Sequence, residues 1–242
     1  DDIISHFKGT IKVNSKVIIP YDEQEVSQLL QALEKEPLHW RMMITLALTT
    51  GMRRGELLGL EWKHIDWKTG VIDVSQTLVQ ALKGEIIVKE PKTKNSKRKI
   101  SLPGSVLEEL REYYAYRIKE RDKLKDAWNG KDREGREWNF IFSHADGTPF
   151  HHERPYLWFR QFIKKNGMRY IRFHDLRHTS ATLLINQGVH AKIISDRLGH
   201  GNITTTMNIY GHALRSADQA AADKFDSLFT SRKDKQNKKT LG

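Results

Sequence analysis

The chain has 242 residues, a length that supports one large globular domain or two small ones. Lys and Arg number 41 against 30 Asp and Glu, and the formal net charge is +11. This excess favours a polyanionic partner, nucleic acid first and an acidic membrane surface second. The sequence has no cysteine, which excludes disulfides and cysteine-based zinc sites and is compatible with a reducing compartment.

The ends of the sequence differ in character from its middle. Residues 1–20 show little helical periodicity and are interpreted as a linker or extended lead. Because the chain opens with DDII and no Met, we expect a fragment whose preceding domain is missing. Residues 21–230 are predicted to form the main domain, and the basic tail at 231–242 is predicted to be disordered. The longest apolar stretch, around MMITLAL, is far too short to span a bilayer.

Helical patterns open the main domain and give way to strands. YDEQEVSQLLQAL predicts a helix with Asp22 as its N-cap and Glu25 completing a capping box. A second helix through WRMMITLALTT is expected to end at Gly51, and GMRRGELLGL begins another. From residue 71 to residue 102 the pattern is β-rich. Three pieces there predict a three-stranded antiparallel sheet: VIDVSQTLV, EIIVKE and KRKISLP.

The second half is predicted to be mostly helical. Residues 104–128 form one helix, whose apolar face consists of Leu107, Leu110, Tyr114 and Ile118. FIFSHADGTPF is expected to form a short strand and a turn. Three or four helices follow to about residue 229, with Gly188 and Gly199 as stops. The predicted fold class is therefore α+β, mainly helical, with one small antiparallel sheet.

The segment HDLRHTSATLL, at 174–184, carries a dense group of basic side chains. At about 100° per residue, His174, Arg177 and His178 fall on one side of a helix. The opposite side, which is expected to be buried, consists of Leu176, Leu183 and Leu184. In the first helical turn the dipole is positive, so these cations make sense if an anion joins them. A solvated helix start without a function is the alternative.

A metal site is a further alternative for the same segment. His174 and His178 have the i, i+4 spacing of the zinc-binding motif H-E-x-x-H. Asp175 stands where that motif has its glutamate, and Arg177 would repel a metal ion. A third ligand would have to come from one of three other histidines: His151, His152 or His200. No spacing selects among them, so the metal site is the weaker hypothesis.

Three other motifs accompany HDLRHT. TTGMRRGELLGL places Glu56 three residues after Arg53, at the start of a helix. EPKTKNSKRKI places Lys92 in a turn between two predicted strands, and LGHGNITTTMNIYGHA places Tyr210 ten residues after His200. In this order, the four motifs resemble those of the catalytic domain of tyrosine recombinases, the integrases of phages and mobile elements. The resemblance runs from about residue 20 to residue 225 and implies the DNA breaking–rejoining fold.

The resemblance also implies which residues form the site. The family order is Arg, Lys, His-x-x-Arg, His or Trp, then Tyr, which corresponds to Arg53, Lys92, His174, Arg177, His200 and Tyr210. Glu56 would support the site without entering the chemistry. Other basic residues of the hairpin are expected to bind the DNA backbone: Lys89, Lys94, Lys97 and Arg98. Structural roles are expected for His178, Trp62, Trp67 and Trp158.

The family reaction is the attack of a tyrosine oxygen on a DNA phosphodiester, giving a 3′-phosphotyrosine and a free 5′-hydroxyl. A phenol with a pKa of about 10 is ionised in only about one molecule in a thousand at pH 7, so it needs a base and nearby cations. The resemblance gives His174 the role of base, while Arg53 and Arg177 grip the non-bridging oxygens. His200 donates a hydrogen bond and Lys92 protonates the leaving oxygen. These cations replace metal ions, so no metal, cofactor or ATP is expected.

By the same resemblance, the partner is double-stranded DNA and the working unit is a homotetramer that passes through a Holliday junction. The isolated fragment is expected to be monomeric, in the bacterial cytoplasm at the nucleoid, with accessory DNA-bending or excision proteins and no membrane. SADQAAADKFDSLF predicts an amphipathic helix that either passes to a neighbouring subunit or docks on its own domain. In the family a helical core-binding domain normally precedes the catalytic domain. Residues 1–20 of this sequence are too few to form one, which is a departure from the family pattern.

A helix-turn-helix regulator is the main non-enzymatic alternative. TLLINQGVHAKIISDRLGHGNITTT fits a helix, a turn and a second helix, and the net charge suits DNA. A regulator, however, would have no use for Arg53, Lys92, His200 and Tyr210 in this pattern. We therefore predict site-specific strand exchange that integrates and excises a mobile element.

Overall fold

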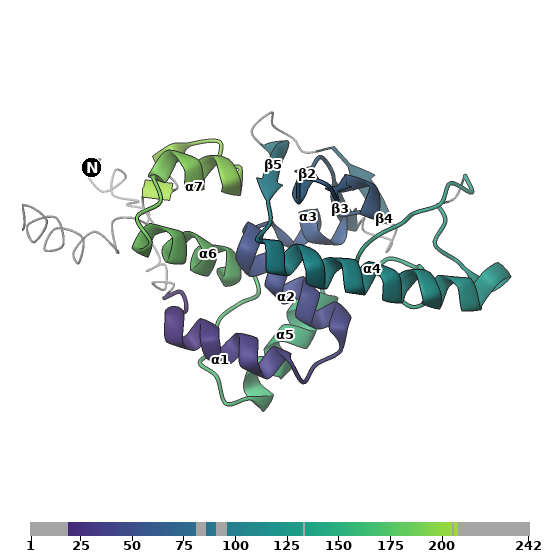
Figure 1. Cartoon of the computed structure of the whole chain (residues 1–242), viewed down its shortest axis with the longest axis horizontal. Coiled ribbons are helices and arrows are strands. Elements are labelled where there is room, and N and C mark those ends of the chain that lie inside the picture. The colour runs from purple at the N-terminus through teal and green to yellow at the C-terminus, as the bar shows by residue number, and fades with distance from the viewer. Residues whose placement is uncertain (1–18, 81–85, 91–95, 133, 205, 208–242) are drawn as a thin grey trace, which may run out of the picture.

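The computed structural model describes residues 19–80, 86–90, 96–132, 134–204 and 206–207 (Figure 1). The helices are α1 (Glu23–Leu33), α2 (Leu38–Thr50), α3 (Arg54–Leu58), α4 (Gly104–Leu124), α5 (Arg154–Lys165), α6 (Asp175–Asn186) and α7 (Ala191–Leu198), with short 3-10 turns η1 (Trp62–His64) and η3 (Lys125–Ala127). The strands are β1 (Ile65–Asp66), β2 (Val71–Val74), β3 (Thr77–Gln80), β4 (Ile86–Lys89) and β5 (Arg98–Ser101). The predictions for Lys92, Lys94, Tyr210, the C-terminal helix and the tail concern residues outside these ranges.

The first two helices begin and end where the sequence predicts. Asp22 accepts a hydrogen bond from the Glu25 amide at 2.8 Å and donates its own amide to the Glu25 carboxylate at 3.0 Å, which completes the capping box of α1. Gly51 ends α2 with a φ of 62°, a left-handed conformation that glycine adopts at no steric cost. α2 is buried along most of its length, from Met42 to Leu48, which places it at the centre of the domain.

The β-rich region forms two small antiparallel sheets. A three-stranded antiparallel sheet is present, as predicted, but its members differ: the order is β1-β2-β5, with Ile72 opposite Ile100. EIIVKE instead contributes β4, which pairs only with β3. The chain leaves the first sheet between β2 and β3, where the side-chain amide of Gln76 donates to Gly59 O at 2.6 Å and to Glu61 Oε1 at 2.9 Å. The predicted strand in FIFSHADGTPF is reduced to isolated bridges, such as Ser143 with Pro149.

The inward face of α4 differs from the predicted one. The buried residues are Val106, Leu110, Tyr113 and Arg117. Of the predicted face only Leu110 is fully buried, whereas Tyr114 and Ile118 are each 37% exposed. Two polar anchors explain the rotation, because Tyr113 donates to Ile141 O at 2.9 Å and Arg117 donates to Ser143 Oγ at 2.8 Å. Tyr114 serves a different contact, with its ring 4.8 Å from that of Trp62.

The long helix α4 crosses the molecule, with the strands along one side of it, α1 and α5 on the other, and α6 and α7 at one end (Figure 1). The predicted structural tryptophans Trp62, Trp67 and Trp158 are partly buried and pack against the main core. No helix in the described ranges is long and apolar enough to cross a membrane.

α6 is buried on two sides, which corrects the prediction for its basic face. Leu176 is fully buried as expected, but Leu183 and Leu184 are only half-buried, whereas Arg177 is 4% exposed. The physical reason is that α7 covers the side of α6 that was expected to face away from the core. Ala181 joins two α7 residues, Ile194 and Leu198, in a separate small cluster. Arg177 therefore enters the protein between helices.

Candidate active site

The C-terminal end of α2 holds two arginine side chains. Arg177 Nη1 donates to Gly51 O at 2.6 Å, and Arg197 Nη2 donates to Thr49 O at 2.6 Å. The last carbonyls of a helix lack intrahelical partners and lie at the negative end of its dipole. The end of a buried helix therefore stabilises two cations that carboxylates would otherwise have to balance.

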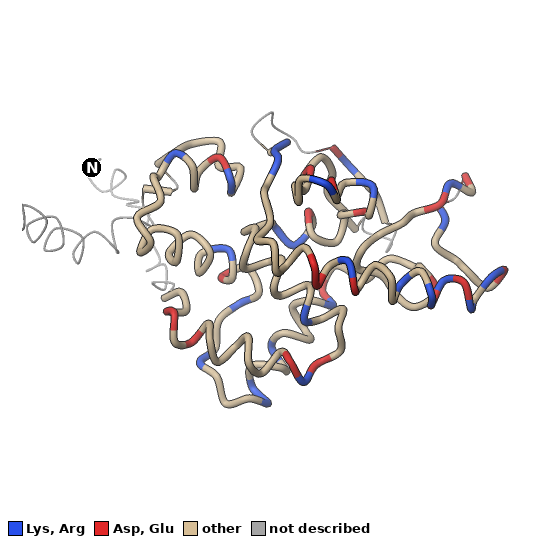
Figure 2. Tube along the Cα trace, in the orientation of Figure 1, with Lys and Arg blue, Asp and Glu red and all other residues tan. Residues whose placement is uncertain are grey.

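The C-terminal end of α7 holds two more arginines in the same way. Arg98 Nε donates to Arg197 O at 2.7 Å, and Arg53 Nη2 donates to Gly199 O at 3.1 Å. Gly199 closes α7 in a left-handed conformation with a φ of 66°, as the sequence predicts for a stop. Figure 2 shows the basic segments of α6, α7 and β5 that surround this region. Two helix ends thus converge on one cluster of guanidinium groups.

Glu56 is the carboxylate that joins two members of the cluster. Its Oε1 accepts from Arg53 Nη1 at 2.8 Å, and its Oε2 accepts from the Arg53 amide at 2.9 Å and from Arg98 Nη2 at 2.9 Å. Burial opposes ionisation of Glu56, but the hydrogen bonds from Arg98 and Arg53 outweigh it and hold the Glu56 pKa below its ordinary value. Glu56 thus fixes the positions of Arg53 and Arg98 relative to each other.

Arg98 does not fit the role predicted for it. We expected it to bind the DNA backbone with the other hairpin residues, but its side chain is only 6% exposed. Every nitrogen of its guanidinium group already donates within the protein, to Glu56, Arg197 O and Ser96 O. Arg98 therefore joins β5 to α3 and α7, and it positions Glu56 and, through it, Arg53.

Close packing of α7 on the end of α2 brings these parts together. A side-chain carbon added at Gly51 would lie 2.2 Å from Leu198 Cδ2, which is far inside van der Waals contact. Only glycine at this position lets Leu198 approach so closely, and Leu198 directly precedes Gly199. Gly51 thus ends α2, supplies the acceptor for Arg177 and allows α7 to reach Arg53.

The guanidinium of Arg177 has an unused donor. Its Nη2 is buried and has no hydrogen-bond partner among the described residues, whereas Nη1 is satisfied by Gly51 O. Burial first, and then the charge of nearby Arg53, lowers the Arg177 pKa to about 9. A buried donor without a partner costs free energy, so native proteins rarely keep one without a reason. An anion placed between Arg177 and Arg53 would supply the missing acceptor.

His200 lies beside the two predicted catalytic arginines. Its Nδ1 is 2.7 Å from the hydroxyl oxygen of buried Thr206, a hydrogen bond that orients the ring and leaves Nε2 for another partner. Burial, and then the charges of Arg177 and Arg53, lowers the His200 pKa to about 4, so the free protein holds a neutral ring here. The structure thus brings Arg53, Arg177 and His200 into one site.

His174 is the N-cap residue of α6 and points toward His178, with ring centroids 5.6 Å apart and the rings edge to face. Burial of the ring, and then His178 and Arg177, lowers the His174 pKa to about 4. No three His, Asp or Glu residues of the described ranges group in a way that could hold a metal ion.

The predicted hairpin residues are only partly described. Lys89 ends β4 and is exposed, and Lys97 Nζ pairs with exposed Glu90 at 2.8 Å. Sequence reasoning missed Arg197, whose Nη2 also donates to Ser101 O at 3.0 Å. A basic residue two positions before a helix-ending glycine is a recognisable signal for a cation at a helix C-terminus. That signal is present in DRLGHG.

Comparison with known proteins identifies the family of the chain. The sequence matches the phage integrase family over residues 21–217. It is 32% identical to the ICEBs1 integrase of Bacillus subtilis over 205 residues, which cover 85% of this chain and 53% of that protein. It is 30% identical to a tyrosine recombinase XerC-like protein of Caldanaerobacter subterraneus, covering 86% of this chain and 54% of the relative. The chain therefore spans about half the length of these curated relatives.

A solved structure shows the same fold. The Tn1549 transposon integrase, in complex with transposon right end DNA, superposes with a TM-score of 0.70 at 26% identity, covering 85% of this chain and 65% of that one. With a family match over most of its length, this chain belongs to the phage integrase family. The expected family and fold class are confirmed.

Proposed function

We propose that this chain is the catalytic part of a site-specific DNA recombinase, which cleaves and rejoins DNA through a 3′-phosphotyrosine to integrate and excise a mobile element. The observation that carries the proposal is the buried, unpartnered Nη2 of Arg177 beside Arg53 and His200. A DNA phosphate supplies the acceptor that this donor lacks.

The charge of the cluster supports a phosphate as its ligand. Arg53 and Arg98 pair with the Glu56 carboxylate, whereas nearby Arg177 and Arg197 have backbone carbonyls at the end of α2 as their acceptors. Such preorganised donors favour the transition state of phosphoryl transfer, in which charge gathers on the non-bridging oxygens. The same cations would lower the pKa of a tyrosine hydroxyl brought next to them.

The remaining roles follow the family pattern. Tyr210 is the proposed nucleophile, His174 the base that accepts its proton, and Lys92 the acid that protonates the leaving 5′-oxygen. His200 donates to a non-bridging oxygen, which requires a proton on Nε2. The hydrogen bond of Nδ1 with Thr206 is compatible with either tautomer, so the ring can present a donor to DNA.

The proposal extends to the protein's partners and organisation. The catalytic domain occupies about residues 21–230, preceded by a lead from an N-terminal core-binding domain and followed by a basic tail. Double-stranded DNA is the substrate, a homotetramer is the working unit, and accessory bending or excision proteins assist it in the bacterial cytoplasm at the nucleoid. Several solved relatives are described as complexes with DNA, including a Tn1549 integrase with circular intermediate DNA.

A covalent-attachment assay tests the function. Nicked duplexes carrying the attachment sequences of the source element are incubated with the protein, so that the cut end diffuses away and the adduct accumulates. Denaturing electrophoresis should then show protein joined to DNA, with Tyr210 as the modified residue in peptide mapping. Tyr210→Phe should abolish the adduct and keep DNA binding, because the arginines remain. Tyr170→Phe, at a tyrosine that is 56% exposed, is the matched control and should react normally. An adduct on another tyrosine would contradict the assignment.

A further inference from the structure

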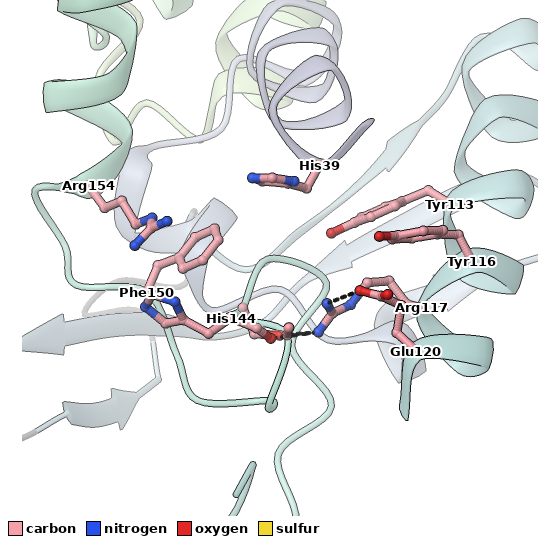
Figure 3. Close-up of a pocket in the computed structure, with 10 residues that line it drawn as sticks. His39, Tyr113, Tyr116, Arg117, Glu120, His144, Phe150 and Arg154 are labelled. Carbon is pink, nitrogen blue, oxygen red and sulfur yellow. Dashed lines mark hydrogen bonds and ion pairs between the residues drawn. The ribbon is translucent and has the colours of Figure 1, made fainter. Parts of the chain in front are cut away.

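A cationic cavity lies at the end of α2 opposite the arginine cluster. It has a volume of about 160 Å³ and lies between the first turn of α2, the middle of α4, the turn at 143–150 and the start of α5. His39 lines it from α2 and Arg154 from α5 (Figure 3). Twelve residues separate His39 from Gly51, so at about 1.5 Å per residue the cavity is roughly 18 Å from the cluster at the helix end. It is therefore separate from the candidate active site.

The side chains around this cavity carry more positive than negative charge. Two guanidinium groups, those of Arg117 and Arg154, and two imidazoles face it, and Glu120 is the one carboxylate among the lining residues. Arg117 is buried and donates to Ser143 Oγ and to His144 O, both at 2.8 Å, with the Glu120 carboxylate 4.0 Å away. Glu120 thus balances the charge of Arg117, and no other lining carboxylate balances the charge of Arg154.

Arg154 is held at the cavity by aromatic rings. Its guanidinium carbon lies 4.7 Å from the centroid of the Phe150 ring and 5.9 Å from that of Trp40. No described carboxylate or carbonyl accepts a hydrogen bond from this guanidinium group. Stacking on ring faces orients a guanidinium group and leaves its N–H edge free. Arg154, an exposed residue, is therefore a preoriented donor that has no acceptor among the described protein groups.

The His39 ring also has no hydrogen-bond partner among the described residues. The ring lies at the beginning of α2, between Arg154 and Tyr113, and extends toward the Arg154 side of the cavity (Figure 3). No hydrogen bond to its nitrogens is formed within the described ranges. Burial first, and then the charges of Arg154 and Arg117 and the His144 ring, lowers the His39 pKa to about 4. The electrostatic potential at this ring is positive, so a bound anion would raise the His39 pKa again.

Two helix starts add to this potential. α2 and α5 both begin at the cavity, and neither has a side-chain cap on its first turn. The positive ends of two helix dipoles, one free guanidinium group and one unpaired imidazole therefore meet at a single small space. Its volume is below the roughly 300–1,000 Å³ of cavities that hold drug-sized ligands, which limits the occupant to a small group.

We propose that this cavity binds a phosphate group, with Arg154 and His39 donating to its oxygens and Arg117 supplying further positive potential from behind. The phosphate belongs either to the backbone of a nucleic acid or to a small phosphate compound. The two sources share the chemistry that the cavity recognises, and they differ in what a substitution at Arg154 does to DNA binding.

The first test uses inorganic phosphate and amide resonances of the turn at 143–146, measured by NMR on the whole chain. Phosphate should move these resonances, whereas chloride at equal ionic strength should not. The shifts should persist in Arg177→Gln, which impairs the candidate active site, and should disappear in Arg154→Gln. Arg160→Gln, which removes an exposed charge from the same helix outside the cavity, is the control and should keep them.

The proposal would be overturned if phosphate caused no shifts, if chloride caused the same shifts, or if the shifts remained in Arg154→Gln.

The second test identifies the source of the phosphate through the salt dependence of DNA affinity. If the cavity holds a backbone phosphate, Arg154→Gln should reduce the slope of log affinity against log salt by about one. An unchanged slope together with lost phosphate shifts assigns the cavity to a small phosphate compound. These readouts do not depend on the proposed recombination activity.

Discussion

Replacing Arg98 should destabilise the protein far more than replacing any exposed arginine. The Arg98 side chain is 6% exposed and makes two hydrogen bonds to the Glu56 carboxylate, at 3.2 and 2.9 Å. Arg98→Met would leave Glu56 buried with Arg53 as its single charged partner and would leave Arg197 O without its donor. Breaking a buried ion pair by removing one partner costs about 3–5 kcal/mol of unfolding free energy. Two charge-assisted hydrogen bonds, at about 1.5–3 kcal/mol each, give a similar range.

Urea unfolding followed by tryptophan fluorescence measures this cost, and a double-mutant cycle assigns it to the pair. Arg98→Met and Glu56→Gln together should cost less than the sum of the single variants, by about 1–3 kcal/mol, because each removes the other's need for a partner. Arg136→Met is the control: its side chain is 76% exposed, and its pairs with Asp132 and Glu134 should contribute less than about 1 kcal/mol.

Additive effects in the cycle, or a cost of Arg98→Met close to that of Arg136→Met, would refute the reasoning. Arg98→Lys separates the charge from the geometry of the guanidinium. A lysine restores the positive charge but cannot reach Glu56, Arg197 O and Ser96 O at once. The free energy of unfolding of Arg98→Lys should therefore lie between that of the parent protein and that of Arg98→Met.

Three further predictions concern single sites or conditions. Gly51→Ala should lower the free energy of unfolding by at least about 1–3 kcal/mol in chemical denaturation, since the new methyl group overlaps Leu198 and the backbone φ is positive; an unchanged midpoint would contradict the close packing. DNA affinity should rise as pH falls from 7 toward 5, because a bound phosphate raises the His200 pKa from about 4 and binding takes up a proton. His200→Gln should weaken this pH dependence. An equal pH dependence in both proteins would argue against a role of His200 in phosphate binding. EDTA should leave formation of the covalent adduct unchanged, and loss of the adduct on chelation, restored by a divalent cation, would point to a metal-dependent nuclease.

Much of the fold follows from local signals in the sequence. The capping box at Asp22 and the stops at Gly51 and Gly199 are encoded within a few residues, and all three occur as predicted. The sheet membership depends on where the chain leaves β2. At that exit Gln76 contacts Gly59 and Glu61, which lie 17 and 15 residues earlier in the chain, and hydrophobic periodicity does not reveal such contacts.

The candidate site, too, could be predicted from the sequence only in part. The motifs identified Arg53, Arg177 and His200, and the structure brings them together. The role of Arg98 could not be predicted, because a lysine-rich hairpin looks solvated until its one buried arginine is paired with Glu56 from another element. The inward side of α6 was mispredicted for a related reason: α7 packs on α6, and Gly51 at the end of α2 supplies the acceptor of buried Arg177. The assignments of Lys92 and Tyr210 remain predictions from their motifs.

The unpartnered nitrogen of Arg177 has a consequence for the protein as a folded object. A buried donor beside like charges is a local conflict that the rest of the fold must outweigh, and such conflicts concentrate where proteins give up stability for function. Among the described residues this conflict lies where α2, α6 and α7 meet, and a bound phosphate, as proposed above, would relieve it. A polyanion that binds the cluster in the folded protein and not in the unfolded chain should therefore raise the melting temperature.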